Sequence, residues 1–488
     1  MGSSFETCLM LPRTGNEHHE QQSLYRRVLV ESKKLWSIVG PAILVNLLNF
    51  TTIVITQAFA GHLGDFEFAS ISVSNSLIFG FNNGLMLGMS SALETLCGQA
   101  FGAKRYRMVG IYMQRAWITL FLCATLLLPV YIFATPILRW NGQSEELAVM
   151  AGNVSIWSIP LHYSYVFLCP LTRFLMSQSK NSIIAVISSF VFVFHIFITW
   201  LFVNEMELGL FGIVMTLNLS WWFNAICLFG YVVFGGCPLT WTGFSRDALY
   251  GIWDFIKFSI SSGIMICLET WYSSSVLILF TSKLKNAQIL VDALSICLSV
   301  NGWMFMISLA FFAATGVRVA NELGAGNGNA AKFSIKVSVF TSMLVGLIMA
   351  CSLMILRHKY GFIYTSSPQV LDIIYKLTWH VAISVLLNSA QLVFSGVAIG
   401  SGWQALVAYV NIGSYYLIGI PLSLILGYGL DLGVFGIWSG MIGGIFLQTS
   451  VLTYITVNCD WDKEALEAGK RVKKWSINKK NIELMQIS

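Results

Sequence analysis

Charged residues are scarce in this chain, at 11% of its 488 residues. A water-soluble domain carries about 25%, so this chain cannot cover a water-facing surface of its own size. That scarcity excludes a soluble enzyme and a disordered protein. Hydrophobic residues instead make up 56% of the sequence, and the mean hydropathy is +0.71. Since a helical span needs about 20 apolar residues, the composition predicts a polytopic membrane protein.

The sequence also lacks the usual motifs of metal and redox sites. Its 10 cysteines include no C-x-x-C pair, and its 7 histidines form neither H-x-x-x-H nor H-E-x-x-H. The net charge of +6 is modest, and the basic residues cluster in the tails and in certain loops. We therefore expect no metal, no cofactor and no nucleic-acid partner.

Long apolar segments fill most of the chain. Residues 1–34 are polar and contain no signal-peptide core, so we expect an N-terminal tail that stays in the cytosol. Twelve apolar segments follow, near 36–59, 69–92, 109–136, 151–172, 182–203, 209–234, 254–281, 288–314, 334–356, 371–398, 404–427 and 432–457. A charged, partly helical tail is predicted over 459–488.

Basic residues occur mainly in alternate loops. They follow the even-numbered segments and the last one, as Lys104, Arg105, Arg107, Arg173, Lys180, Arg246, Arg318, Lys332, Lys336, Lys470 and Arg471. Because positively charged loops stay on the cytosolic side, both termini are predicted to be cytosolic.

Two motifs recur at an offset of about 222–224 residues. Leu208–Ile213 returns as Leu432–Ile437, and Gln99–Ala103 resembles Asn321–Ala325. Six spans per repeat is an even number, so both halves enter the membrane from the same side. This predicts an all-α polytopic membrane protein with an N-lobe over 35–235 and a C-lobe over 236–458, related by a pseudo-two-fold axis along the membrane normal. Such a repeat favours a transporter.

Glu269 is the clearest candidate for function, because an ionisable group inside a span is costly and usually functional. A buried carboxyl can take up a proton on one side of the membrane and release it on the other. The alternative is a structural carboxyl bonded to nearby hydroxyls. Asp292, near the outer end of the eighth segment, is either a second protonatable group or a helix cap.

Polar side chains also line several other segments. The tenth segment carries Ser384, Asn388, Gln391 and Ser395 on one helical face, which either lines a wet cavity or holds helices together. Asn75 lies in a similar stripe of the second segment. Asn46 follows Pro41 in the first segment, where the proline is a candidate hinge.

Five motifs in this order resemble the multidrug and toxic compound extrusion (MATE) family, and specifically its plant DETOXIFICATION group. The resemblance covers about Glu31 to Trp475, and the motifs are Gly61–Gly64, Glu94–Ala103, Cys267–Tyr272, Val317–Asn327 and Ser395–Gln404. It implies twelve helices in two six-helix lobes arranged as a V around a central cavity. It further implies proton-coupled antiport of organic solutes such as flavonoids, alkaloids, hormones and xenobiotics, with Glu269 as the proton-coupling residue.

The chain departs from the family pattern at two positions. Some plant members have an aspartate in the tenth span where this chain has Asn388, so we expect one protonation site with Asn388 as polar support. The acidic first-span residue of prokaryotic relatives is absent, which makes sodium coupling unfavourable and leaves the proton motive force as the energy source.

We expect substrate between the lobes, held by aromatic and amide side chains. Trp271, Tyr272, Asn301, Trp303, Tyr415 and Tyr416 are the candidates in the C-lobe, with Asn388, Gln391, Asn46 and Asn75. The alternative function is a passive channel for anions, whereas the lone carboxylates supply no constellation for an enzyme. A monomer in the tonoplast or the plasma membrane is predicted.

Overall fold

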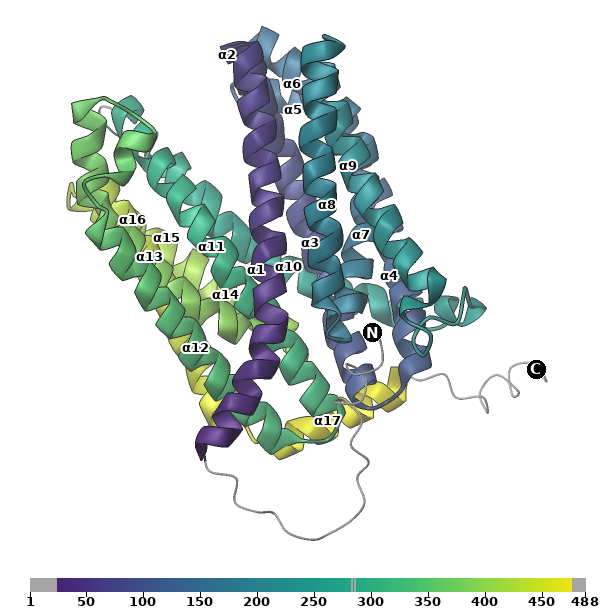
Figure 1. Cartoon of the computed structure of the whole chain (residues 1–488). Helices are drawn as coiled ribbons and strands as arrows, with labels where there is room; N and C mark the ends of the chain where they lie inside the picture. Colours follow the sequence, from purple (N-terminus) through teal and green to yellow (C-terminus); the bar gives the residue numbers. More distant parts are fainter. Residues whose placement is uncertain (1–23, 282–283, 285–286, 476–488) are drawn as a thin grey trace.

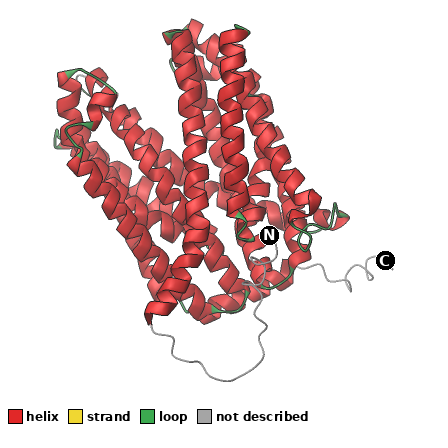
Figure 2. Ribbon diagram, viewed as in Figure 1, coloured by secondary structure: helices red, strands yellow, loops and turns green. Residues whose placement is uncertain are grey.

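The computed structural model describes residues 24–281, 284 and 287–475, and every regular element in these residues is a helix (Figure 2). Helices suit a bilayer because they satisfy their backbone hydrogen bonds internally, where no water is available. The predicted all-α polytopic class is confirmed. Residues 1–23 of the predicted N-terminal tail and residues 476–488 of the C-terminal tail lie outside the described chain.

Two successive halves make up the structure. The first comprises α1 (Leu24–Leu63), α2 (Asp65–Val73), η1 (Ser74–Phe79), α3 (Gly80–Gly102), α4 (Tyr106–Ile132), α5 (Ala134–Trp140), α6 (Glu145–Trp157), α7 (Ile159–Ser177), α8 (Asn181–Trp200), η2 (Leu201–Glu205), α9 (Gly209–Tyr231) and η3 (Val232–Gly236). The second comprises η4 (Arg246–Leu249), α10 (Ile252–Thr281), α11 (Ala287–Gly324), α12 (Gly328–Ile355), η5 (Tyr360–Ile363), α13 (Pro368–Ser401), α14 (Gln404–Asn411), η6 (Ile412–Gly419), α15 (Ile420–Leu424), η7 (Ile425–Gly429), α16 (Gly433–Asn458) and α17 (Trp461–Trp475).

Each of the twelve predicted segments overlaps one helix or a run of consecutive helices. In the described chain, nine helices are long and apolar enough to cross a membrane, and the pair α6 and α7, bent by 43°, would make ten. The predicted number is therefore not reproduced by this measure. The predicted segments near 69–92 and 254–281 are not among these ten. The first falls short because α3 carries asparagine, serine and glycine where a typical span carries leucine.

Helices α1–α9 form one bundle and α11–α16 a second, arranged as a V (Figure 1). The bundles diverge at one end and converge at the other, where α1 begins and α17 lies. We call the convergent end the closed end. We refer to α1–η3 as the N-lobe and to η4–α16 as the C-lobe.

The repeated Leu-Gly-x-Phe-Gly-Ile motif has the same local conformation in both lobes. Each copy follows a π-helical turn, η2 or η7, and starts α9 or α16. Residues Glu207 and Gly209 have φ of 50° and 56°, and their counterparts Asp431 and Gly433 have 54° and 58°. The two copies thus leave one helix and begin the next by the same left-handed turn.

The second repeated motif meets its own copy at the closed end. A Cβ atom on Gly102 of α3 would collide with the backbone of Asn321 in α11, and one on Gly324 of α11 would collide with the backbone of Gln99 in α3. Lipid gives no hydrophobic drive for helices to associate, so close contact between small residues stabilises them. This reciprocal contact is what a two-fold axis between the repeats requires.

Helix α17 lies across the closed end (Figure 1). Its buried residues Trp461, Ala465, Ala468 and Val472 are spaced by four, three and four, so they form one apolar stripe. The remaining face is rich in lysine, arginine and glutamate. The prediction of a charged and partly helical tail is confirmed for the described residues.

Candidate functional site

The carboxylate of Glu269 lies on α10 and accepts a hydrogen bond from Nε2 of Gln391 on α13. The same Nε2 atom lies 3.3 Å from Oγ of Ser395 and 3.5 Å from the hydroxyl oxygen of Tyr415. Glu269 is partly buried, and Gln391 and Ser395 are buried. The polar stripe of the tenth segment therefore reaches the carboxylate, which gives an otherwise costly charge a hydrogen-bonding partner.

Three predicted aromatic residues gather beside this carboxylate. The rings of Tyr272 and Tyr415 stack at 4.4 Å with an interplanar angle of 8°, and the Tyr416 ring lies 6.2 Å from that of Tyr272. Backbone carbonyls fix two hydroxyls, because Tyr272 donates to Met441 O and Tyr416 donates to Leu268 O, both at 3.0 Å. Tyr272 and Tyr415 are each only 1% exposed. In this conformation these two rings present almost no surface to a solute, whereas Tyr416 is partly exposed.

Other predicted aromatic residues connect the lobes. The Trp303 ring of α11 packs edge-on against Phe50 of α1 at 4.8 Å. The exposed Trp271 of α10 lies 6.2 Å from Phe81 of α3. The predicted first-segment residue Asn46 donates through Nδ2 to the carbonyl oxygen of Met306 at 3.1 Å, which also joins α1 to α11.

Within the described part of the chain, no hydrogen bond links the remaining amide candidates to Glu269. The bonded partner is Gln391, whereas Asn388 lies one turn earlier on α13 and is partly buried. The buried Oδ1 of Asn301 has no hydrogen-bond partner among the described residues. Asn75 lies partly buried in η1.

The last two candidates from the sequence are Asp292 and Pro41. Asp292 is exposed near the start of α11, and within the described chain it forms no ion pair. The first helix runs without a break through Pro41, from Leu24 to Leu63. The helix shows no break at Pro41 in this conformation, so the role of Pro41 as a hinge remains a prediction.

Glu94 of α3 is fully buried and pairs with Arg173 at 2.8 Å. The expectation that Arg173 lies in a loop is wrong, because α7 continues to Ser177 and holds this side chain inside the N-lobe. Because α7 extends past its apolar segment, it places the charged Arg173 side chain inside the bundle instead of in a loop.

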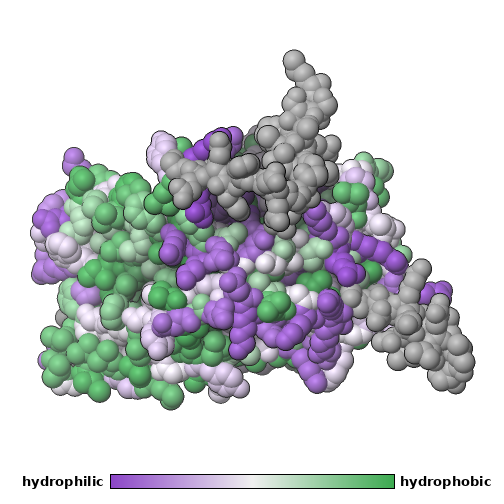
Figure 3. Space-filling model, turned by 90° about the horizontal axis from the view of Figure 1, so that it is seen from below, coloured by the Kyte–Doolittle hydropathy of each residue, from purple (hydrophilic) through white to green (hydrophobic). Residues whose placement is uncertain are grey.

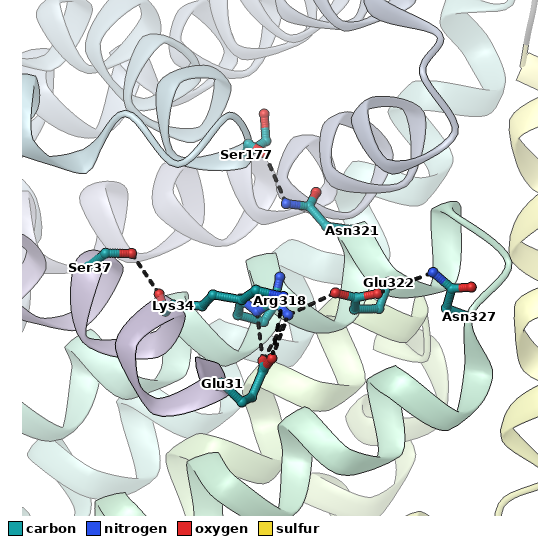
Figure 4. A network of polar contacts seen from close by, with 8 residues as sticks. All are labelled: Glu31, Lys34, Ser37, Ser177, Arg318, Asn321, Glu322 and Asn327. Atoms are coloured by element: carbon teal, nitrogen blue, oxygen red, sulfur yellow. Dashed lines mark hydrogen bonds and ion pairs between the residues drawn. The ribbon is translucent and has the colours of Figure 1, made fainter. Parts of the chain in front are cut away.

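A buried ion-pair network joins the lobes at the closed end (Figure 4). Arg318 of α11 donates from Nε and Nη2 to the two carboxylate oxygens of Glu31 in α1, at 2.9 and 3.0 Å. Its Nη2 also donates to Glu322 at 2.8 Å. The side chains of Arg318 and Glu31 are each 10% exposed. Two parallel hydrogen bonds between an arginine and a carboxylate hold the two side chains in one relative orientation and bring their opposite charges together. Arg318 was also expected in a loop, and α11 instead runs on to Gly324.

A second group of bonds closes the same end around α3. Thr95 donates to the carbonyl oxygen of Ile399 at 2.6 Å, and Gln99 donates to that of Gly400 at 2.9 Å. Arg471 of α17 donates through Nη1 to Gln99 and to the carbonyl oxygen of Ser401, both at 3.0 Å. The repeated motif around Gln99 was visible in the sequence, but its partners on α13 and α17 were not.

Residues 41–201 and 262–425 match the MatE family model, which together make up more than half of the chain. The chain belongs to the MatE family. Protein DETOXIFICATION 27 of Arabidopsis thaliana is 55% identical over 477 residues, covering 97% of this chain and 98% of the relative. Protein DETOXIFICATION 28 of the same plant is 52% identical over 460 residues, covering 94% of each.

Solved structures agree with this family assignment. The crystal structure of the eukaryotic MATE transporter AtDTX14 has a TM-score of 0.87 and 33% identity, covering 91% of this chain and 99% of the other. The Vibrio cholerae MATE transporter VcmN in the bent form, at 15% identity, has a TM-score of 0.76 over 92% and 99% of the chains and so shares the fold. The MatE chain is thus a multi-pass membrane transporter of the multidrug and toxic compound extrusion family, and its relatives are transporters rather than enzymes.

Replacing Arg318 with alanine is expected to weaken the closed end of this MatE transporter. The change removes the guanidinium that pairs with both Glu31 and Glu322 and leaves Glu31 only the longer contact to Lys34 at 3.8 Å. Breaking a buried pair costs about 3–5 kcal/mol. Hydrogen–deuterium exchange should therefore rise by about 100-fold or more in the first turns of α1 and the last turns of α11. The matched control is Arg107→Ala, which removes a surface pair with Asp247 and should change exchange little. Equal protection in both variants would show that the Arg318 pair does not hold the closed end together.

Proposed function

We propose that this MatE transporter is a proton-coupled antiporter that exports organic solutes from the cytosol by alternating access. The observation that carries the proposal is the Glu269 carboxylate, which lies in a membrane helix with Gln391 as donor and tyrosine rings beside it. A titratable group in this setting can exchange a proton for a solute. Flavonoid, alkaloid, hormone and xenobiotic molecules share the flat or cationic chemistry that aromatic rings bind, and Tyr416 and Trp271 are the candidate rings with exposed surface.

Protonation of Glu269 changes both charge and hydrogen bonding. The ionised carboxylate attracts a cationic solute and accepts from Gln391. Once protonated, it carries no charge and its own hydroxyl becomes a donor, so Gln391 is free to turn towards Ser395 or Tyr415. Proton uptake from the acidic side therefore weakens solute binding and rearranges the contact between α10 and α13.

Alternating access requires the closed end to open and close. The basic residues collect at this end, so we infer that it faces the cytosol and that the conformation described here opens to the opposite side. The buried bonds of Arg318 and Gln99 then act as the cytosolic gate. We place the protein as a monomer in the tonoplast or the plasma membrane, where an acidic compartment supplies the protons, with no metal or sodium ion in the cycle.

Uptake into proteoliposomes with an imposed pH gradient tests this proposal. Each pH unit is equivalent to 1.36 kcal/mol, or tenfold in concentration. A two-unit gradient should therefore sustain about a 100-fold accumulation of solute by one-for-one exchange. The solutes to compare are a flavonoid glycoside, an alkaloid and an inorganic anion.

The same experiment separates the antiporter from its alternative. Accumulation that collapses when an ionophore removes the pH gradient supports antiport. Flux of the inorganic anion that follows its own gradient at every pH would instead show a passive channel, and the proposal would then fail.

A further inference from the structure

A pocket of about 520 Å³ lies between the start of α10 and the end of α17, and the mechanism above does not use it. Four cationic side chains and two carboxylates line it: Lys257, Lys470, Arg471, Lys474, Asp254 and Glu467. The excess of positive charge favours an anion. Figure 3, which views the molecule from this end, shows hydrophilic residues gathered across its central part.

The lysines of this pocket are held only weakly by their protein partners. Lys474 lies 3.5 Å from Asp254, and Lys470 lies 2.7 Å from Glu467, with both lysine side chains at least 70% exposed. Exposed pairs of this kind contribute little. A phosphate monoester, such as the one on a phosphoinositide headgroup, carries more charge than a carboxylate and has three acceptor oxygens. It can therefore engage the lysines in place of these carboxylates or beside them.

The surroundings of the pocket suit a lipid headgroup. α10 is one of the predicted spans, and two exposed aromatic residues lie at its start: Trp253 in its first turn and Tyr250 two residues before it. Aromatic side chains favour the boundary between headgroups and acyl chains. Lys257 Nζ lies 5.6 Å from the centre of the Trp253 ring, so this cation sits at the same level. Clusters of four or more basic residues next to a membrane helix bind anionic lipids.

We propose that the pocket between α10 and α17 binds the phosphate of an anionic lipid headgroup. Lys257 supplies the contact from α10, and Lys470 and Lys474 supply it from α17. A lipid bound in this way fastens the end of α17 to the C-lobe.

Fastening α17 has a consequence for the closed end, because this helix contacts both lobes. Arg471 bonds Gln99 of the N-lobe and the carbonyl oxygen of Ser401 in the C-lobe. The ring of Trp475 lies 6.5 Å from Tyr112 of the N-lobe and 6.2 Å from Phe255 of the C-lobe. Bound lipid should therefore stabilise the closed end, a consequence that rests on the proposed alternating access.

Thermal unfolding of the purified full-length protein in detergent tests the binding directly. Tryptophan fluorescence is followed while short-chain phosphatidylinositol 4-phosphate is added, and parallel titrations use short-chain phosphatidylcholine and soluble inositol trisphosphate. The phosphoinositide should raise the unfolding temperature in a saturable way. In the triple variant Lys257→Gln, Lys470→Gln, Lys474→Gln, the lipid concentration at half-saturation should rise by about tenfold or more.

A matched triple variant controls for the loss of charge. Lys33→Gln, Lys104→Gln, Lys332→Gln changes three exposed lysines that do not line the pocket, and it should bind as the wild type does. The unfolding temperatures of both variants without lipid show whether they fold. Equal weakening in the two variants, or none in either, would overturn the site. Saturable binding of inositol trisphosphate with no advantage for the lipid would overturn the lipid assignment.

Transport and binding can then be judged separately. Hydrogen–deuterium exchange at the closed end, with and without phosphoinositide, should show slower exchange in wild type and no change in the pocket variant. A protein that binds the lipid but shows no pH-driven uptake loses the antiporter proposal and keeps the site. A protein that accumulates solute but binds no anionic lipid loses only the site.

Discussion

Replacing Glu269 with glutamine is expected to abolish accumulation of solute against its gradient. Glutamine has nearly the same shape and keeps an oxygen that can accept from Gln391, but it cannot take up a proton at any physiological pH. In proteoliposomes with a two-unit pH gradient, the accumulation ratio should fall from about 100 to about one, since each unit is worth tenfold. Exchange down a solute gradient should remain measurable.

Asp292→Asn is the matched control, because it makes the same acid-to-amide change at an exposed position of α11. It should accumulate solute as the wild type does. If Asp292→Asn loses accumulation and Glu269→Gln keeps it, Asp292 carries the proton and our proposal names the wrong carboxylate. A loss in both variants would mean that two carboxylates share the coupling.

Much of the Glu269 site could be predicted from local sequence. An acid inside an apolar segment is conspicuous, and the helical period brings Gln391 and Ser395 to one face of their own helix. The pairing between the helices could not be predicted, because Gln391 and Glu269 are 122 residues apart and their contact depends on how α10 and α13 pack. From the sequence both Asn388 and Gln391 are candidates on this helix, and only the packing of α10 against α13 shows that Gln391 bonds to Glu269.

The closed end was harder to predict, for a related reason. A positive charge at the end of an apolar segment normally marks a loop in water, and Arg318 fits that pattern. The partner that buries it, Glu31, is 287 residues away, in a polar part of the sequence that continues into α1. Helix length was underestimated at both positions, since hydropathy marks the bilayer core rather than the full helix.

Replacing Gly102 with alanine is expected to open the closed end and to slow transport strongly. The new methyl group would meet the backbone of Asn321, which cannot rotate away as a side chain could, so α3 and α11 must separate. Such overpacking costs about 1–3 kcal/mol, and the separation also strains the nearby bond from Gln99 to Gly400. Hydrogen–deuterium exchange should rise at the ends of α3 and α11, by roughly 5- to 150-fold. Gly84→Ala in the same helix has open space around the new methyl group and should leave exchange and transport unchanged.

The repeat makes a sharper test, because Gly324→Ala places a methyl group against the backbone of Gln99 on the other side of the same contact. Each single variant must push α3 and α11 apart, and that one separation makes room for both methyl groups. The double variant Gly102→Ala, Gly324→Ala should therefore be destabilised by clearly less than the sum of the single changes, as neighbouring sites are generally not additive. Additive effects on the unfolding temperature and on exchange would show that the two glycines act in separate contacts. The pseudo-two-fold axis would then not run through this crossing.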